Sequence, residues 1–247
     1  MISAVIITYN EAKHIAATIN SCKDVVDEVI VIDAQSTDDT ILIAQQVDQK
    51  VKTFVKYWEG YGAARNHGAA KAKHDWILSI DADERCSQAL LESIKKVQLE
   101  KTVAFQVRRE NIYKSEIIKY GFLAPEWKTR LYHKLVASWG DEIVHESLQP
   151  KQGKLEYRQL NGGLMHHAYE SQVHHREKLD QYAKLSVQSK NRKPFDLLAD
   201  KLAPTYHFVR AHFLKLGCLQ SPYGMETSKN AYYYSKRKRF YLKSSKG

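Results

Sequence analysis

Short apolar runs alternate with amphipathic stretches along about the first 85 residues of the chain. The apolar runs are short and rich in β-branched side chains, which predicts buried strands at residues 2–8, 28–33, 51–55 and 76–80. The stretches between them have helical spacing or are rich in alanine, which predicts helices at 11–22, 40–48 and 63–73. Strands that alternate with helices of this length predict a parallel, doubly wound α/β sheet with right-handed crossovers.

After about residue 85, apolar and amphipathic stretches no longer alternate regularly. The pattern there predicts a helix at 87–99, strands at 102–109 and 129–133, a loop at 138–146 and a turn at Gly162-Gly163. Helices are predicted at 171–189 and 205–216, with Pro194 and Pro204 as interruptions before the second of them. One face of the 205–216 helix is apolar and carries Tyr206, Val209, Phe213 and Leu216. The sheet is therefore expected to be followed by a helical C-terminal appendage.

Two aspartates, Asp81 and Asp83, come directly after the apolar run Trp76-Ile77-Leu78-Ser79-Ile80. In open α/β sheets the crevice beyond the carboxyl ends of the strands holds the ligand, and Thr8, Asn10 and Asp33 are expected at the same edge. Two carboxylates this close repel one another unless a cation lies between them. Oxygen ligands suit Mg²⁺ or Mn²⁺, so the pattern favours a metal-diphosphate site over the alternative of a solvated turn.

Composition and charge narrow the classes of protein. Of the 247 residues 43% are hydrophobic, which excludes a disordered chain, and the three cysteines form no CxxC pair, which fits a reducing cytoplasm. The first apolar run is too short for a signal peptide, and no stretch approaches the roughly 18 apolar residues of a membrane span. The net charge is +10, and no acid follows Glu226, so an anionic partner is expected for the C-terminal segment, either nucleic acid or a phospholipid surface.

Four blocks of sequence together resemble the family 2 glycosyltransferases: TYNE at 8–11, VIDAQSTDDT at 31–40, GYGAARNHG at 60–68 and DWILSIDADE at 75–84. This resemblance implies the GT-A fold, a Rossmann-like, mostly parallel sheet flanked by helices that binds a nucleotide sugar. The segments at 129–148 and 166–186 resemble a bacterial subgroup that adds β-1,4-linked glucose to the inner core of lipopolysaccharide.

The resemblance implies a role for each matching residue. Thr8, Asn10 and Glu11 are expected to contact the uridine, Asp33 the base or ribose, and Arg65 and Asn66 the base or the phosphates. Asp83 is expected to bind the metal directly, and Asp81 to contact the ribose or a metal-bound water. A late histidine, His167 or alternatively His166, is expected on the metal or the diphosphate.

Inverting glycosyl transfer needs a base that takes the proton of the acceptor hydroxyl. The resemblance implies a carboxylate from the second half of the domain. Glu146, next to His145, is the first candidate, Asp141 is the second, and Glu142 is also present.

Three parts are expected: a donor-binding half at 1–110, an acceptor-binding and catalytic half at 111–190, and a membrane-associating segment at 191–247. The last segment mixes tyrosines at 232–234, Phe240 and Tyr241 with lysine and arginine, which suits an anionic membrane surface. The acceptor implied by the resemblance is lipid-anchored, so the inner face of the inner membrane is the expected location and no nucleic acid partner is expected.

The function predicted from the sequence is therefore metal-dependent transfer of a hexose, glucose first, from a UDP-sugar to a heptose of the lipopolysaccharide inner core. The first alternative is another family 2 transfer in cell-envelope polysaccharide synthesis. A sugar nucleotidyltransferase is disfavoured because TYNE replaces its glycine-rich loop, and a dehalogenase-type phosphatase because Arg85 replaces its threonine or valine. A nucleic-acid-binding protein would leave the strand-end acids unexplained.

Overall fold

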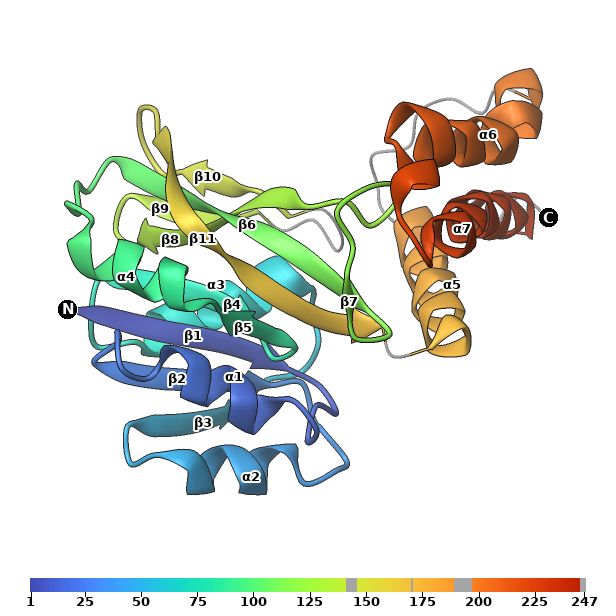
Figure 1. The fold of residues 1–247 in the computed structure, drawn as a ribbon. Helices are drawn as coiled ribbons and strands as arrows, with labels where there is room; N and C mark the ends of the chain where they lie inside the picture. The colour runs from blue at the N-terminus through green and yellow to red at the C-terminus, as the bar shows by residue number, and fades with distance from the viewer. Residues whose placement is uncertain (141–145, 170, 189–196, 245–247) are drawn as a thin grey trace. The chain divides into compact units, whose positions relative to one another are not determined.

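A computed structural model describes residues 1–140, 146–169, 171–188 and 197–244 (Figure 1). The chain divides into two units. Unit 1 comprises Met1–Arg109 and Glu126–His166, and unit 2 comprises Glu110–Pro125 and His167–Gly247. Each unit is compact by itself.

Unit 1 begins with the predicted alternation of strands and helices. Its elements are β1 (Ile2–Thr8), α1 (Ile15–Cys22), β2 (Glu28–Asp33), α2 (Thr40–Val47), β3 (Val51–Val55), α3 (Tyr61–Lys71) and β4 (Trp76–Asp81). The strands are parallel in the order β3-β2-β1-β4, so the first strand lies between the second and the fourth. This arrangement confirms the predicted α/β fold with a mostly parallel first half.

The sheet continues with antiparallel strands. The further elements are β5 (Glu84–Cys86), α4 (Gln88–Lys96), β6 (Val103–Tyr113), β7 (Glu116–Ile117), β8 (Glu126–His133), β9 (Ala137–Trp139), β10 (Leu148–Pro150) and β11 (Glu156–Tyr169). The sheet order beyond β4 is β8-β6-β11-β5, with β7 beside β6, while β9 and β10 form a separate pair. β8 runs antiparallel to β4, and its residues therefore lie next to the strand that carries Asp81.

The predicted turn at Gly162-Gly163 is wrong, because both residues lie inside β11. Gly162 has φ +85°, and a Cβ atom there would lie 2.2 Å from the backbone nitrogen of Leu90 on α4. Glycine is needed at this position because the strand passes close to the backbone of a helix. In a sequence pattern, two consecutive glycines indicate a turn, which explains the wrong prediction.

The central strands of unit 1 are buried on both faces. Ala4 and Ile6 of β1 belong to one apolar cluster together with α1 and α4 residues, while Val5 and Ile7 belong to another that includes α3 residues. Alternate side chains of a strand point to opposite faces, so one apolar run supplies both clusters. The apolar core of unit 1 thus lies directly behind the ends of β1, β2 and β4.

Unit 2 contains α5 (Gln172–Gln188), α6 (Leu197–Val209), a π-helical turn (Arg210–Leu214), a 3-10 turn (Gly217–Leu219) and α7 (Gly224–Ser244). α7 contacts both α5 and α6. The basic C-terminal segment is therefore part of a helical unit, which confirms the predicted helical C-terminal appendage. Among the described residues, no helix has both the length and the apolar character that a membrane crossing needs.

Pro204 does not interrupt the helix in which it lies, contrary to the prediction. α6 starts at Leu197 and runs through Pro204, and Pro194 lies outside the described residues. A proline inside a helix removes one backbone hydrogen bond. Packing of α6 along α7 offsets this loss, and the sequence pattern alone does not contain that contact.

Candidate functional site

The ends of three parallel strands bring the predicted acids to one edge of the sheet. In the register of β1 and β2, Thr8 lies opposite Asp33, and in the register of β1 and β4, Ile7 lies opposite Asp81. Asp33 and Asp81 therefore flank the end of β1 on its two sides. The structure thus places these acids where the crevice of an open α/β sheet binds ligands.

The loops after β1 and β2 are tied together by side chains from both. Ser36 Oγ donates to Asp33 Oδ1 at 2.5 Å and accepts from the Asn10 backbone N–H at 2.8 Å. Asn10 Oδ1 in turn accepts from the Thr37 backbone N–H at 2.8 Å, and Asn10 has the left-handed φ of +52° that asparagine tolerates. Asn10 and Asp33 therefore fix the shape of this edge of the crevice.

Two further residues from TYNE lie at the same edge. Thr8 is buried, and its Oγ1 finds no hydrogen-bond partner within the described ranges. The Glu11 backbone N–H donates to Thr40 Oγ1 at 2.8 Å, which joins the start of α2 to the loop after β1. An unpartnered buried hydroxyl is costly unless a ligand or water satisfies it, so Thr8 fits a ligand-facing position.

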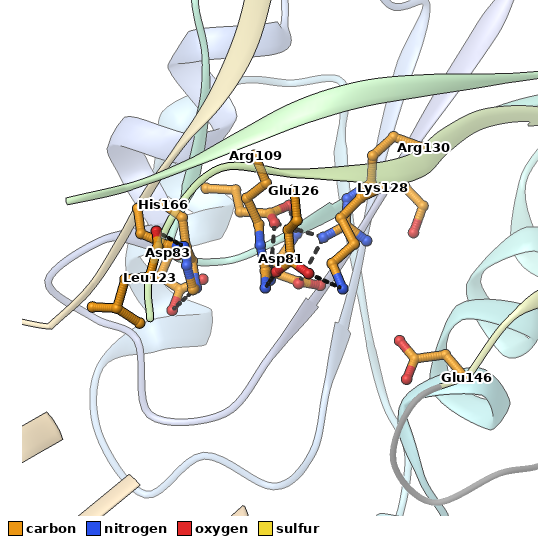
Figure 2. Close-up of polar contacts among 12 residues, drawn as sticks. Asp81, Asp83, Arg109, Leu123, Glu126, Lys128, Arg130, Glu146 and His166 are labelled. Atoms are coloured by element: carbon orange, nitrogen blue, oxygen red, sulfur yellow. Dashed lines mark hydrogen bonds and ion pairs between the residues drawn. The ribbon is translucent and has the colours of Figure 1, made fainter. Parts of the chain in front are cut away.

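Asp81 lies between two arginines, Arg65 and Arg130. Figure 2 labels Asp81 and Arg130. Its Oδ1 accepts from Arg65 Nη2 at 2.8 Å, and its Oδ2 accepts from Arg130 Nη2 at 3.0 Å. Burial by itself would raise the pKa of Asp81, but the cationic Arg65 and Arg130 outweigh burial and hold that pKa well below its ordinary value. Asp81 is thus an ionised carboxylate whose two oxygens are both held by the protein.

Glu84 and Arg109 extend this cluster of charges. Glu84 is fully buried, and its Oε1 accepts from Arg130 Nη2 at 2.5 Å, while its Oε2 accepts from the Asp81 backbone N–H at 3.0 Å. Arg109 Nη1 lies 3.7 Å from Glu84 Oε1, and Arg109 also pairs with Glu126 (Figure 2). Glu84 therefore links the backbone of the Asp81-Ala82-Asp83 turn to the arginines around it.

Glu126 is the outermost acid of this cluster. Lys128 Nζ lies 3.1 Å from Glu126 Oε2, and Arg109 contacts the other carboxylate oxygen. Burial raises the pKa of Glu126, but Arg109 and Lys128 lower it to about 2 overall.

Arg65 connects Asp81 to the first candidate for the catalytic base. Its Nη2 lies 3.3 Å from Glu146 Oε1, and its side chain is almost fully buried on α3. Trp139 covers the guanidinium, with the Arg65 Cζ atom 5.0 Å from the ring centroid. Arg65 is therefore not an exposed helical arginine, and it holds two carboxylates from distant parts of the sequence. Asp141, Glu142 and His145 lie outside the described residues.

Asp83 faces a histidine from the far end of the sheet. His166 Nε2 lies 3.4 Å from Asp83 Oδ2, because β11 pairs with β5 in a register that puts His166 opposite Glu84 (Figure 2). His167 is the next residue of β11 and is only partly buried. The His166 imidazole therefore lies in direct contact with the Asp83 carboxylate.

Asp83 and His166 fit a divalent cation that takes some of its ligands from the protein and others from a diphosphate. Within the described parts of the chain, no group of three histidine, cysteine or acidic side chains is placed to hold a metal ion. Asp83 and His166 provide a carboxylate and an imidazole, and Mg²⁺ typically takes one or two carboxylates and completes its shell with water and substrate phosphates. These residues would therefore hold a metal together with its nucleotide.

The comparison with known protein families decides the identity. Residues 3–161, more than half of the chain, match the model of glycosyl transferase family 2. The chain belongs to this family. The transferase has the GT-A fold expected from its sequence, and the matched region contains the strand ends, both aspartates and Glu146.

Individual relatives agree with this assignment. An uncharacterized glycosyltransferase of Rickettsia felis is 41% identical over 155 residues, which cover 60% of this chain and 54% of that protein. The chain thus spans about half the length of the curated relatives it matches. The names of these relatives state no substrate.

Solved structures give weaker likenesses. Glucosyl-3-phosphoglycerate synthase from Mycobacterium tuberculosis, with Mn²⁺, UDP and phosphoglyceric acid, is 19% identical with a TM-score of 0.46 over 68% of this chain and 70% of that one. Staphylococcus aureus TarS 1-349 with UDP-GlcNAc is 15% identical with a TM-score of 0.43 over 99% and 91%. Both TM-scores lie below 0.5, so these likenesses indicate no ligand for this chain.

Sequence reasoning missed several residues of the site. The sequence pattern assigns Glu84 no role, and it assigns Arg109 and Arg130 only positions in strands. Asn66, which was expected at the nucleotide, exchanges hydrogen bonds with the Trp139 backbone at 2.8 and 2.9 Å. A buried acid beside the two aspartates was a usable signal, but the arginines that neutralise it are recognisable only once β6 and β8 are placed next to β4.

Proposed function

We propose that the transferase moves a hexose, glucose first, from a UDP-sugar to a heptose of the lipopolysaccharide inner core with inversion of the anomeric centre. The observation that carries the transfer reaction is the register that puts Asp33 and Asp81 on either side of the end of β1, in a family 2 chain. The sugar and the acceptor rest on the resemblance of residues 129–148 and 166–186 to the inner-core subgroup.

The donor binds at the edge of β1 and β2 in this proposal. Asp33 and Asn10 shape the uridine side, and the Thr8 hydroxyl and Glu11 lie next to them. Arg65 and Asn66 remain the proposed contacts to the base or the phosphates; Arg65 is anchored by Asp81, and Asn66 by the Trp139 backbone. Asp81, held by Arg65 and Arg130, presents a fixed negative charge toward the ribose or a metal-bound water.

A divalent cation, Mg²⁺ or Mn²⁺, would be held by Asp83 with His166, or with His167 as expected from the sequence, and would stabilise charge on the leaving diphosphate. Asp83 supplies the carboxylate oxygen, and the His166 imidazole at 3.4 Å orients it. The fully buried Glu84 keeps the turn between Asp81 and Asp83 in one conformation through its bond to the Asp81 N–H.

Glu146 is the proposed base, and Asp141 remains the second candidate. The Glu146 side chain is only slightly exposed and is held by Arg65, which also holds Asp81, so base and donor site share one anchor. An in-line attack requires the acceptor hydroxyl and the sugar carbon to be fixed together, and a shared anchor restricts their relative movement. Glu146 would take the hydroxyl proton as the new glycosidic bond forms and the bond to the diphosphate breaks.

The three parts expected from the sequence keep their roles in this proposal: donor binding at 1–110, acceptor binding at 111–190, and membrane association at 191–247. A lipid-anchored acceptor would bring the enzyme to the anionic inner face of the inner membrane.

The test is UDP release from purified protein with UDP-glucose, UDP-galactose and UDP-N-acetylglucosamine, using inner-core lipopolysaccharide that lacks the glucose as acceptor. Wild type is expected to prefer UDP-glucose, and Glu146→Gln should lower kcat about 100-fold or more while leaving the KM for the donor within about threefold. Asp83→Asn should remove the response to Mn²⁺. Undiminished activity of Asp83→Asn in EDTA contradicts the metal role, and transfer only to other envelope saccharides contradicts the acceptor.

A further inference from the structure

An apolar stripe runs along the outside of α6 and into the π-helical turn that follows it. It consists of Leu202, Tyr206, Val209 and Phe213, which are 40% to 61% exposed and which we call the α6 stripe. Their spacings of four, three and four residues keep them on one side of a helix with 3.6 residues per turn. Leu214, Leu216 and Leu219 follow directly and are also exposed, so the apolar surface continues past the helix.

The opposite side of the same segment is packed against the rest of unit 2. Pro204, Ala211 and His212 are buried, and His212 Nδ1 lies 3.3 Å from Ser228 Oγ on α7. α6 and α7 lie side by side over their contact (Figure 1). The stripe is therefore not a face that turns toward α7 to complete the core of unit 2.

The charges that follow the start of α6 are cationic, whereas Asp200 precedes Lys201 in the sequence of the helix. The chain contains no aspartate or glutamate from residue 201 to residue 225, and Lys201, Arg210 and Lys215 are all exposed. An apolar surface with three exposed cations at its border favours a partner that is both anionic and apolar. A bilayer that contains anionic phospholipids has both properties, because headgroups attract the cations and acyl chains accept the apolar side chains.

From these observations we infer that the α6 stripe, with Lys201, Arg210 and Lys215 at its border, is the surface through which the protein docks on an anionic bilayer. This inference moves the lipid contact away from the aromatic and basic side chains of α7, where the sequence placed it. It concerns the membrane partner named in the proposed function, but it does not depend on the sugar, the acceptor or the metal.

Contacts inside unit 2 support this change of location. Arg237 and Tyr241 of α7 both bind Asp180 of α5, with Tyr241 Oη donating to Asp180 Oδ2 at 2.6 Å. Arg176 of α5 lies over the ring of Tyr233, with Cζ 5.3 Å from the centroid. Several side chains that suggested a lipid contact in the sequence therefore hold α5 and α7 together.

The experiment is co-sedimentation of the full chain with vesicles of phosphatidylethanolamine and phosphatidylglycerol, compared with vesicles of phosphatidylcholine. The double variant Leu202→Gln/Phe213→Gln should bind the anionic vesicles at least about 100-fold more weakly, since burial of each large apolar side chain contributes about tenfold or more. Arg210→Gln/Lys215→Gln should reduce the preference for anionic vesicles.

Matched controls separate the stripe from the apolar and basic side chains elsewhere in unit 2. Val173→Gln on α5 removes an equally exposed apolar side chain outside the stripe and should leave vesicle binding within about threefold. Lys236→Gln/Lys243→Gln removes two exposed charges of α7 and should also have an effect below about threefold. Far-UV circular dichroism and thermal unfolding establish that each variant is folded, and UDP release without vesicles reports the transferase reaction separately.

Two results would overturn the inference. One is a stripe variant that is folded and binds anionic vesicles as well as wild type, whether or not the α7 variant loses binding. The other is a wild-type dimer, measured by light scattering without lipid, that the stripe variant converts to a monomer, because the stripe would then be the contact between two copies. Loss of UDP release with normal vesicle binding would count against the proposed reaction and leave the docking surface intact.

Discussion

The Asp81 carboxylate contacts two arginines that are distant in the sequence, Arg65 on α3 and Arg130 on β8. Arg130 also contacts Glu84, whose other oxygen binds the Asp81 N–H. At the scale of residues the site is therefore a closed set of ion pairs, in which each buried charge has a partner. Such sets contribute little net stability when complete, but removal of one member leaves an uncompensated buried charge.

This difference predicts unequal effects of two similar substitutions. Glu84→Gln should lower the free energy of unfolding by about 3 kcal/mol or more, because Glu84 is fully buried between Arg130 and Arg109. Glu126→Gln also removes a partner of Arg109, but that carboxylate is 43% exposed and should cost at most about 1 kcal/mol. Urea unfolding followed by tryptophan fluorescence measures both, and equal losses would contradict the closed ion-pair set.

At the scale of elements, α3 is placed by a close approach to β1 at Gly68 and by the hydrogen bonds of Asn66. Gly68 packs on β1, where a Cβ would lie 2.3 Å from Val5 Cγ1, and Asn66 binds the backbone of β9 in both directions. These contacts set the position of Arg65, which directly precedes Asn66 on the helix. An error in the position of α3 would therefore change both the Asp81 and the Glu146 contacts.

Gly62 gives a test of this placement. Alanine normally stabilises a helix by about 1 kcal/mol relative to glycine. At Gly62 an added Cβ would lie 2.0 Å from the Gly140 carbonyl oxygen, so Gly62→Ala should instead destabilise by about 1–3 kcal/mol and lower kcat. Urea unfolding and UDP release measure the two effects. Ala70→Gly, at an exposed position of the same helix, gives the ordinary propensity effect for comparison. A more stable Gly62→Ala protein would refute the close contact.

Unit 2 contains a buried histidine, His175. His175 on α5 contacts the rings of Tyr169 and Tyr113, with centroid distances of 4.2 and 5.4 Å, and its Nδ1 accepts a hydrogen bond of 2.8 Å from Asn230 Nδ2 on α7. Burial, with smaller contributions from His174, Arg176 and Lys178, lowers the pKa of His175 to about 3. The imidazole is thus neutral in the folded protein under ordinary conditions.

This pKa predicts a dependence of stability on pH. The unfolded chain binds a proton at His175 near pH 6.5, whereas the folded chain does not until about pH 3. The stability that the neutral imidazole supplies is therefore complete above pH 6.5 and is lost progressively as the pH falls toward 3. Urea unfolding followed by far-UV circular dichroism at pH 7.5, 6 and 5 should show this loss for wild type and a smaller one for His175→Leu. His174→Leu should keep the wild-type slope, and an unchanged slope in His175→Leu would refute the assignment.

At the scale of the whole molecule, metal and nucleotide should bind together. Asp83 and His166 supply two protein ligands, and in the proposed function the nucleotide completes the metal site, so EDTA should leave the Tm of the nucleotide-free protein unchanged. UDP should raise the Tm more with Mn²⁺ than without it, by an amount that corresponds to about 2.7 kcal/mol at 100 times Kd.

Asp83→Asn should lose the Mn²⁺-dependent part of this increase, and Asp24→Asn, at an exposed position after α1, should keep it. Differential scanning fluorimetry measures the shifts. A large loss of Tm on treatment of the nucleotide-free protein with EDTA would show instead a metal that belongs to the fold.

The sequence by itself determined the family, the parallel first half of the sheet and the acids at its edge. Periodicity alone located β1 and β2 at their observed bounds, because strands buried on both faces are nearly continuous apolar runs. Asp33 and Asp81 were assigned to one edge because parallel strands end on the same side, and that inference needs no side-chain contact.

Only the tertiary structure decided which charges are paired and which apolar side chains remain exposed. Arg130 reaches Asp81 because β8 inserts antiparallel beside β4, and His166 reaches Asp83 because β11 pairs with β5. The helical spacing of Tyr206, Val209 and Phe213 was visible in the sequence, but whether that face or the opposite one meets α7 was not. The physical reason is that periodicity reports local geometry, whereas ion pairs and covered faces depend on neighbours that are distant along the chain.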